Sequence, residues 1–366
     1  MKSVVLILDM TNDCNLRCSY CYISGGDQQE VINLDNAYNA IKKIGEKFNS
    51  KVQITFHGGE PLLHFERIKS LIQELEDNPF NFQTAYYMQT NGLCITKEIS
   101  DYLKEKNVKV GVSIDGVTRV TNQARLTPDG NSSVEKVLEG IKILQSSGHQ
   151  VSILSVLTSN NYKTYDKNID WFVENGISHF TLNPFIAAGR GVKFKLNITG
   201  KDMFETYKSV LNKIIEYNRI GVFLKEKNLY YMYKCIVEKK KLYMCMSTPC
   251  GAGISQFAVD PNGDVYPCAD FCGQESFILG NVNEDFFVKI PKSKVWREIR
   301  SIGLEQIETC KICEYKELCP SGCSARRYYT NNSIASVDPV CEYYKLMIPY
   351  MLDEINKKKI IEIWGK

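Results

Sequence analysis

The sequence predicts an α/β fold built around a parallel sheet, and two observations favour this class. In the first half of the 366-residue chain, short runs rich in β-branched and aromatic residues alternate with stretches of helical periodicity. Such alternation is typical of βαβ units and a parallel sheet. The hydrophobic content of 44% allows real cores, and the length favours about two or three domains.

The expected elements are six strands and five intervening helices. The strands are expected at residues 4–8, 52–56, 85–88, 108–114, 151–157 and 179–182, and the helices between them at 35–47, 65–76, 97–106, 134–147 and 162–175. Helices at 202–218 and 228–240 follow, then a cysteine-dense segment and a terminal helix at 343–361 that packs back on the body. We therefore divide the chain into a sheet region at 1–195, a helical bridge at 196–244, a cysteine-rich domain at 245–345 and a C-terminal helix at 346–366.

Polar and cysteine residues follow the ends of the expected strands. A cysteine loop follows the first strand, His57-Gly58-Gly59-Glu60-Pro61 the second, Gln89-Thr90-Asn91-Gly92 the third and Ser113-Ile114-Asp115-Gly116 the fourth. Parallel barrels and doubly wound sheets both place function at the carboxyl ends of their strands. We therefore expect these residues to meet at one end of the sheet.

Charge and hydropathy exclude several classes of function. Lys plus Arg number 45 against 42 Asp plus Glu, and the net charge of +3 is too balanced to favour nucleic acid or a membrane surface as the main partner. The apolar run at residues 3–8 is too short for a secretory signal, and no later run is long enough to span a bilayer. We expect a cytoplasmic protein with no nucleic-acid or membrane partner.

Three cysteines near the start, Cys14, Cys18 and Cys21, lie on one tight loop. Thiolates select iron–sulfur clusters or zinc, and ordinary electron-transfer clusters are closed by four of them. Three ligands would leave one iron of a [4Fe-4S] cluster open to another molecule. The chain has fourteen cysteines, and in a reducing cytosol they are more often metal ligands than disulfides.

This loop resembles the signature of the radical S-adenosylmethionine (SAM) superfamily, CxxxCxxC with an aromatic residue before the last cysteine, here Tyr20. The resemblance implies a partial (β/α)6 barrel in residues 1–195 and a cluster whose open iron is chelated by the amino and carboxylate groups of SAM. It also implies that Gly58, Gly59 and Glu60 contact the SAM amino group. Paired glycines let backbone approach a ligand closely, and a carboxylate suits an ammonium.

Further SAM contacts come from similarity to maturases of this superfamily. Ser113 and Arg125 are expected at the polar end of SAM and Phe185 beside the adenine, and Asn91, after the third strand, joins the expected cofactor-binding residues. On the residues alone, Arg125 could equally form a surface ion pair and Phe185 could be a core aromatic.

A second cysteine pattern occupies the C-terminal part of the chain. Cys250, Gly263 and Cys268 are followed by Cys310-x2-Cys313-x5-Cys319-x3-Cys323 and then by Cys341. The pattern resembles a SPASM domain, the auxiliary-cluster module of peptide- and protein-modifying radical SAM enzymes. With Cys245 it supplies eight ligands, enough for two closed [4Fe-4S] clusters. The interleaved pairing of related maturases implies a first set of Cys245, Cys250, Cys268 and Cys323, and a second set of Cys310, Cys313, Cys319 and Cys341.

Two points about these cysteines stay open on the sequence. The spacing is also compatible with a structural zinc site. Iron and sulfide analysis separates the two readings, with about twelve iron atoms for three clusters against about four plus zinc. Without Cys245, the first auxiliary cluster would keep an open iron able to bind a substrate thiolate.

The candidate catalytic residues are Asp270 and Cys272, which follow the cluster cysteine Cys268. In anaerobic sulfatase-maturating enzymes, which the chain resembles in length and layout, an aspartate directly follows the corresponding cysteine and accepts a proton. Here Ala269 intervenes, and Asp270 could instead cap a turn. The segment from Gly273 onward is more similar to thioether-forming peptide maturases.

The resemblance implies reductive cleavage of SAM to a 5′-deoxyadenosyl radical that abstracts hydrogen from a substrate carbon. Our favoured hypothesis is a cysteine thioether crosslink in a ribosomally made peptide, and the alternative is conversion of a sulfatase cysteine or serine to formylglycine. A third hypothesis is a non-catalytic iron–sulfur electron carrier, which needs neither Glu60 nor an open iron.

The expected partners follow from this chemistry. They are a peptide or protein substrate that contains cysteine and a low-potential electron donor such as flavodoxin or ferredoxin. Thirteen residues precede Cys14, too few for a winged-helix leader-recognition domain. A separate leader-binding protein is therefore expected to present the peptide, unless the barrel mouth and auxiliary domain recognise it alone.

Overall fold

The computed structural model of the chain describes residues 3–241, 243–357, 359–360 and 364. Its first six strands are β1 (Ser3–Asp9), β2 (Lys51–His57), β3 (Thr84–Thr90), β4 (Lys109–Ser113), β5 (Ser152–Leu157) and β6 (His179–Pro184). They lie in chain order, and each pairs in parallel with the next. The six predicted strands are confirmed, with small differences at their ends.

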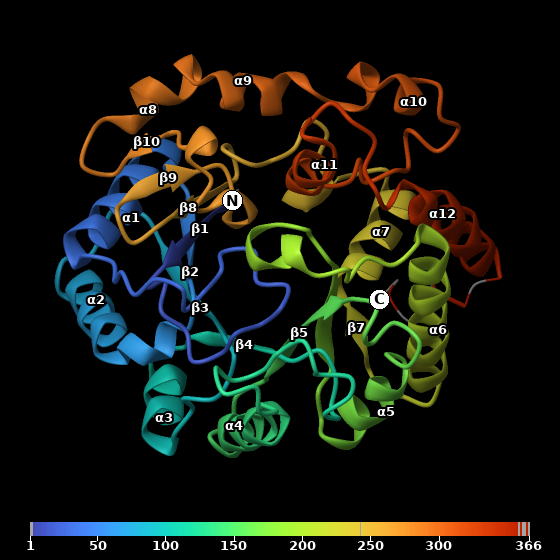
Figure 1. Cartoon of the computed structure of the whole chain (residues 1–366), viewed down its shortest axis with the longest axis horizontal. Coiled ribbons are helices and arrows are strands. Elements are labelled where there is room, and N and C mark those ends of the chain that lie inside the picture. The colour runs from blue at the N-terminus through green and yellow to red at the C-terminus, as the bar shows by residue number, and fades with distance from the viewer. Residues whose placement is uncertain (1–2, 242, 358, 361–363, 365–366) are drawn as a thin grey trace.

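The helices between the strands cover the outside of the curved sheet (Figure 1). They are α1 (Leu34–Phe48), α2 (Phe65–Asp77), α3 (Lys97–Glu105), α4 (Val134–Ser146) and α5 (Lys167–Glu174). Helix α5 begins five residues later than the sequence predicted. Asn161 explains the delay, because its side chain bonds the backbone of Thr158 and Val156 and so competes with helical hydrogen bonds.

The core of the barrel is the layer between sheet and helices. Leu6, Ile54, Val112 and Ile153 alternate with less buried neighbours along their strands and have no exposed surface. Burying a side chain of this size contributes about 1.5–3 kcal/mol. The alternation fixes which residues of each strand face the helices. The parallel pairing then aligns the carboxyl ends of the strands at one end of the barrel.

The bridge between the two cysteine regions contains α6 (Gly200–Arg219), the short strand β7 (Lys225–Glu226) beside β6, and α7 (Lys227–Glu238). The last helix, α12 (Cys341–Asn356), packs on α6, and the rings of Tyr207 and Tyr343 lie 4.9 Å apart. The sequence predicted this helix at 343–361. It starts two residues earlier and ends by 356, and part of the predicted range, residues 358 and 361, lies outside the described residues.

The cysteine-rich part is joined to the barrel by the sheet itself. Strand β8 (Gln256–Val259) pairs in parallel with β1, and β9 (Asp264–Tyr266) and β10 (Gly280–Asn281) continue the sheet antiparallel. The remaining helices, α8 (Phe286–Lys289), α9 (Lys294–Ser301), α10 (Glu308–Lys311) and α11 (Ser324–Asn331), are short. Figure 1 shows α8, α9 and α10 along the top of the molecule. Among the described residues, no helix combines the length and the apolar character needed to cross a membrane.

Candidate functional site

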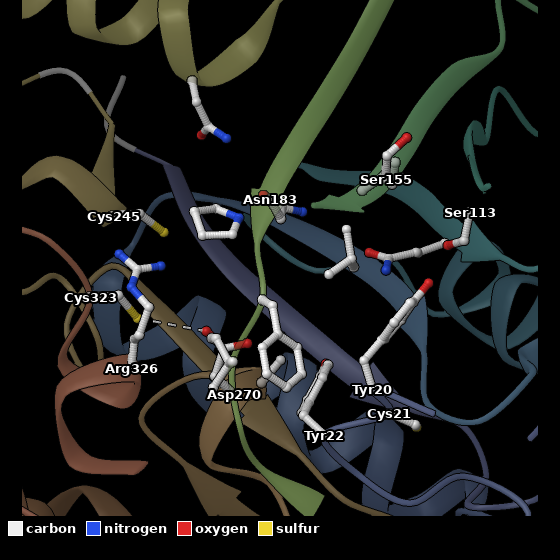
Figure 2. Close-up of a pocket in the computed structure, with 18 of the residues that line it drawn as sticks. Tyr20, Cys21, Tyr22, Ser113, Ser155, Asn183, Cys245, Asp270, Cys323 and Arg326 are labelled. Atoms are coloured by element: carbon white, nitrogen blue, oxygen red, sulfur yellow. Dashed lines mark hydrogen bonds between the residues drawn. The ribbon is translucent and has the colours of Figure 1, made fainter. Parts of the chain in front are cut away.

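A cavity of about 400 Å³ lies at the carboxyl ends of the barrel strands. Each of the first six strands contributes to its wall, namely Ile7, Thr55, Gln89, Ser113, Ser155 and Asn183. Tyr20, Cys21 and Tyr22 line one side, and Asp270, Cys245, Cys323 and Arg326 from the cysteine-rich part line another (Figure 2). Residues from both halves of the sequence therefore face one space.

The cysteine loop after β1 brings Cys14, Cys18 and Cys21 to the cavity wall. Burial raises the pKa of the Cys14 thiol to about 12 and that of Cys18 to about 11. Iron–sulfur clusters bind thiolates, so loading this loop must release the protons that burial favours. The charges of Cys18 and Cys21 raise the pKa of Cys14 further, and a bound cluster would offset this repulsion.

Gly58 and Gly59 hold the end of β2 against the start of the cysteine loop. A Cβ on Gly59 would lie 2.0 Å from the carbonyl oxygen of Asp13, and Gly58 has a φ of +117°. The amide of Gly59 donates to the oxygen of Thr11 at 2.7 Å, and that of Glu60 to the oxygen of Asp13 at 2.8 Å. Only glycine permits this approach, so both glycines position the cysteine loop as well as lining the cavity.

Glu60 lies behind the cavity wall, unlike its two glycine neighbours. Its side chain is fully buried, and the carboxylate accepts from the hydroxyl of Thr90 at 2.6 Å and from the amides of Asn91 at 2.7 Å and Leu62 at 3.1 Å. These bonds tie the end of β2 to the end of β3. The three bonds give this carboxylate a structural role, and its contact with SAM stays a prediction.

Tyr20, Arg125 and Asp115 form a charged group beside the cysteine loop. Arg125 donates to the hydroxyl of Tyr20 at 2.7 Å and is 7% exposed, so it is not a surface residue. Among the described residues, Arg125 Nε and Asp115 Oδ2 are buried with no hydrogen-bond partner. Burial raises the pKa of Asp115, whereas the charge of Arg125 lowers it. Arg125 lines the cavity, and its unpaired buried donor fits a ligand that carries an anionic group.

The other expected SAM contacts line the same cavity. Asn91, Ser113 and Phe185 are all on its wall. Phe185 is buried in a small apolar cluster with Tyr20 and Cys18, so it is both a core aromatic and a cavity residue. At the end of the cavity that the cysteine loop lines, the donors of Arg125 and Asn91, the paired glycines and the three thiols fit an iron–sulfur cluster with bound SAM.

The first auxiliary set gathers at the far end of the cavity. Cys245 and Cys323 line the wall. Cys245 is an exposed residue that forms part of this wall. Burial raises the pKa of Cys268 well above its usual value, and the nearby charges of Asp270, Cys323, Cys250 and Cys245 raise it further. The four thiols are therefore near enough for their charges to interact, and the interleaved pairing stays a prediction.

The second auxiliary set surrounds a separate small cavity, which Cys310, Cys313, Cys319 and Cys341 line together. Burial raises the pKa of Cys319 to about 12, with a further contribution from Cys341 and Cys310. Tyr344 borders both this cavity and the large one. All fourteen cysteines of the chain are free of disulfides, so these thiols are available to metal.

The two expected catalytic residues lie in different places. Asp270 lines the cavity, and its Oδ2 lies 4.0 Å from Cys323 Sγ (Figure 2). Burial raises the pKa of Asp270, while the charges of Arg326 and His57 oppose the rise. Cys272 is buried away from the cavity wall beside Asp9, whose charge raises the pKa of the thiol further. The structure therefore places Asp270 on the cavity wall and Cys272 off it, and the catalytic role of each stays a prediction.

Sequence reasoning assigned no role to three residues of the cavity wall, Tyr22, His57 and Arg326. His57 Nδ1 lies 2.8 Å from Asp9 Oδ1 and its Nε2 lies 3.4 Å from the hydroxyl of Tyr22. Asp9 and His57 are the paired last residues of β1 and β2, so their strand-end positions were an available signal. Arg326 makes two 2.8 Å bonds to Asp338, and no local motif connects those two residues.

Comparison with known proteins agrees with this architecture. The model of the radical SAM superfamily matches residues 8–172, and that of the SPASM iron–sulfur cluster-binding domain matches residues 250–314. The chain therefore carries a radical SAM domain followed by a SPASM domain. The predicted fold is confirmed, and the hypothesis of a mere electron carrier is not supported.

Individual relatives match nearly the whole chain. It is similar to the cysteine-type anaerobic sulfatase-maturating enzyme of Clostridium novyi, with 26% identity over 94% of each chain. It is also similar to the radical SAM cyclopropyl synthase TigE of Paramaledivibacter caminithermalis, with 25% identity over 96% of this chain and 74% of the relative. The structure resembles native anSMEcpe with bound AdoMet and Kp18Cys peptide, with a TM-score of 0.85, 22% identity and coverage of 98% and 99%.

Proposed function

We propose that the chain oxidises a cysteine-containing ribosomal peptide and forms a thioether crosslink between a cysteine and a neighbouring residue's carbon. One observation carries this proposal: a single cavity joins the three-cysteine loop to Asp270, Cys245 and Cys323. A substrate held in this cavity would face a radical source at one end and an electron acceptor at the other. Relatives whose names refer to a bound peptide or to sulfatase maturation support a peptide or protein substrate.

Three [4Fe-4S] clusters and SAM are the cofactors that this function requires. Cys14, Cys18 and Cys21 would hold the first cluster, and the two auxiliary sets the others. Bound SAM would supply the 5′-deoxyadenosyl radical that removes a hydrogen atom from the substrate. Arg125, Tyr20 and Ser113 would orient the polar end of SAM, and Phe185 would exclude water beside its adenine.

Asp270 would accept the proton released when the substrate radical is oxidised. Its carboxylate lies on the cavity wall between Tyr22 and the first auxiliary set (Figure 2). Arg326 supplies nearby positive charge, which would stabilise the ionised carboxylate before it takes the proton. Glu60 would act as a positioning residue, because it fixes Asn91 and the glycine turn from behind.

Formylglycine formation is the second candidate. The near full-length similarity to sulfatase-maturating enzymes favours it. Ala269 between Cys268 and Asp270 favours the thioether, because it departs from the maturase pattern in which aspartate directly follows the cysteine.

Mass analysis separates the two products. Reduced enzyme is incubated with SAM and either a cysteine-rich peptide or a sulfatase-derived peptide. We expect loss of two hydrogen atoms with sulfur retained for the thioether, whereas formylglycine from cysteine loses sulfur and gains oxygen. The matched variant Asp270→Asn should still form 5′-deoxyadenosine but little product. Absence of 5′-deoxyadenosine with every peptide would contradict the proposal.

A further inference from the structure

The turn after β6 carries an exposed patch of four residues, Val192, Lys193, Phe194 and Lys195, which we call the 192–195 patch. Val192 is 67% and Phe194 44% exposed. Neither lysine takes part in an ion pair within the part of the chain that the structure describes. Two apolar side chains thus alternate with two free cations on the surface.

The inner side of the same turn rests on the cysteine loop. The amide of Arg190 donates to the oxygen of Cys21 at 3.0 Å, and its guanidinium donates to the oxygens of Cys18 and Gly25, each at 3.0 Å. After the patch, Leu196 is buried in the apolar cluster that includes Cys18. In Figure 1 the turn is the light green segment at the centre of the view, beside the blue cysteine loop. The patch is therefore the outer face of a turn whose inner face contacts two of the three cysteines.

The patch lies outside the cavity, since none of its four residues lines the cavity wall. A substrate in the cavity does not need it. The proposed reaction, on which this inference rests, begins when one electron enters the cluster before SAM is cleaved, and one electron leaves later when the substrate radical is oxidised. The first of these electrons comes from outside. That electron must pass from a donor at the protein surface to the cluster held by Cys14, Cys18 and Cys21, and electron transfer favours a short path.

We propose that the 192–195 patch is the docking surface for an acidic, low-potential electron-carrier protein with a flavin or iron–sulfur group. Lys193 and Lys195 would steer the acidic surface of the donor, and Val192 and Phe194 would form the desolvated centre of a small transient interface. In the docked complex one electron leaves the reduced donor and enters the cluster, the donor is oxidised by one electron, and no atom is transferred. Arg190 links the docking face to the cysteine loop.

The experiment reverses the charge of the patch and uses reduced flavodoxin as the probe. The test variant is Lys193→Glu with Lys195→Glu. The matched control is Lys292→Glu with Lys294→Glu, two exposed lysines with the same spacing at the start of α9. For each protein, loaded with clusters, calorimetry measures flavodoxin binding, and chromatography measures 5′-deoxyadenosine formed with flavodoxin or with dithionite.

We expect the test variant to bind flavodoxin about tenfold more weakly or worse, because two attractive charge contacts become repulsive. Its flavodoxin-driven rate should fall in parallel, its dithionite-driven rate should match the parent, and the control should match the parent throughout. Phe194→Ala should also weaken binding without changing the salt dependence.

Equal flavodoxin binding by the test variant and the control, or a loss of peptide affinity in place of flavodoxin affinity, would overturn the proposal. A parent that makes no 5′-deoxyadenosine with dithionite would contradict the proposed function and leave the binding result intact.

Discussion

Strands β1 and β8 lie side by side in one sheet, but they belong to two regions that are built differently. The barrel has strands of five to seven residues and a large core of fully buried aliphatic side chains. The cysteine-rich segment has helices such as α8 and α10 of four residues each, and four of the ten buried residues in its own core cluster are alanines. Alanine buries little apolar area. Although β8, β9 and α8 add Val259, Val265 and Phe286 to the main core cluster, we expect the barrel to fold on apolar packing alone and the rest of the segment to need its metal sites.

The largest expected effect comes from removing one cysteine in each region. Cys18→Ala removes a ligand of the radical-generating cluster, so 5′-deoxyadenosine formation should be abolished and about four iron atoms lost, with almost no change in the melting temperature. Cys319→Ala should also lose about four iron atoms but should unfold part of the segment, because metal binding there contributes folding free energy. Iron analysis, calorimetry and amide hydrogen exchange measure these outcomes.

Hydrogen exchange localises the difference between these two variants. In Cys319→Ala, amides of residues 304–341 should lose protection while those of β1–β5 keep it. Cys94→Ala, which changes a cysteine outside all three sets, serves as the control. Global loss of protection in Cys18→Ala would show that the barrel also depends on metal.

The glycine turn tests how strictly backbone contact positions the cysteine loop. Gly59→Ala would place a Cβ 2.0 Å from the Asp13 oxygen, so we expect a loss of about 3 kcal/mol in the free energy of unfolding together with poor loading of the first cluster. Gly130→Ala is the matched control. It has a φ of +76° and nothing within 4 Å of its Cβ, so it reports only the backbone strain of about 1 kcal/mol. Equal losses in the two variants would refute the contact argument.

Glu226, in the short strand β7 of the bridge, gives the stability of the fold a pH dependence. Burial raises the pKa of this carboxyl to about 7, although the amides of Leu182 and Leu229 donate to it at 2.9 and 2.6 Å. An acid whose pKa is raised on folding binds more protons when folded, so stability falls as pH rises from its unfolded value toward 7 and is flat above. Relative to Glu226→Gln, the parent should lose about 2 kcal/mol between pH 5 and 7. Thermal melts of both proteins across this range measure the difference, and parallel curves would contradict it.

The sequence predicted the barrel well because its signals are local. Hydrophobic periodicity located β1 to β6, and the strand-end positions of Gly58, Asn91 and Ser113 placed them at one cavity. The short strands β8, β9 and β10 have two to four residues each, too few for periodicity to show. They exist because β8 pairs with the edge of β1, which is a contact between residues about 250 positions apart that no local pattern encodes.

Side-chain direction was the other limit of sequence reasoning. Motif spacing correctly grouped Gly58, Gly59 and Glu60, but only the fold shows that Glu60 turns inward to Thr90 and Asn91. The same limit applies to Cys272, which follows Asp270 by two residues and yet points to Asp9. Position along the chain was enough to place strand-end residues at the cavity. It was not enough to show which way a side chain such as that of Glu60 or Cys272 points.

The smallest expected effect is also the finest test of the comparison. Phe172 packs on Phe180 in the barrel with ring centroids 5.2 Å apart, and Phe277 stacks on Phe271 in the segment at 3.9 Å. With clusters present, Phe172→Leu and Phe277→Leu should each cost about 1 kcal/mol, since each keeps apolar volume and loses an aromatic pair. After anaerobic removal of iron, only Phe172→Leu should still lower stability, because a segment that has already unfolded without metal no longer contains the pair. Denaturant titration of the four samples measures this, and an equal cost of Phe277→Leu with and without iron would mean that the segment folds on its apolar core.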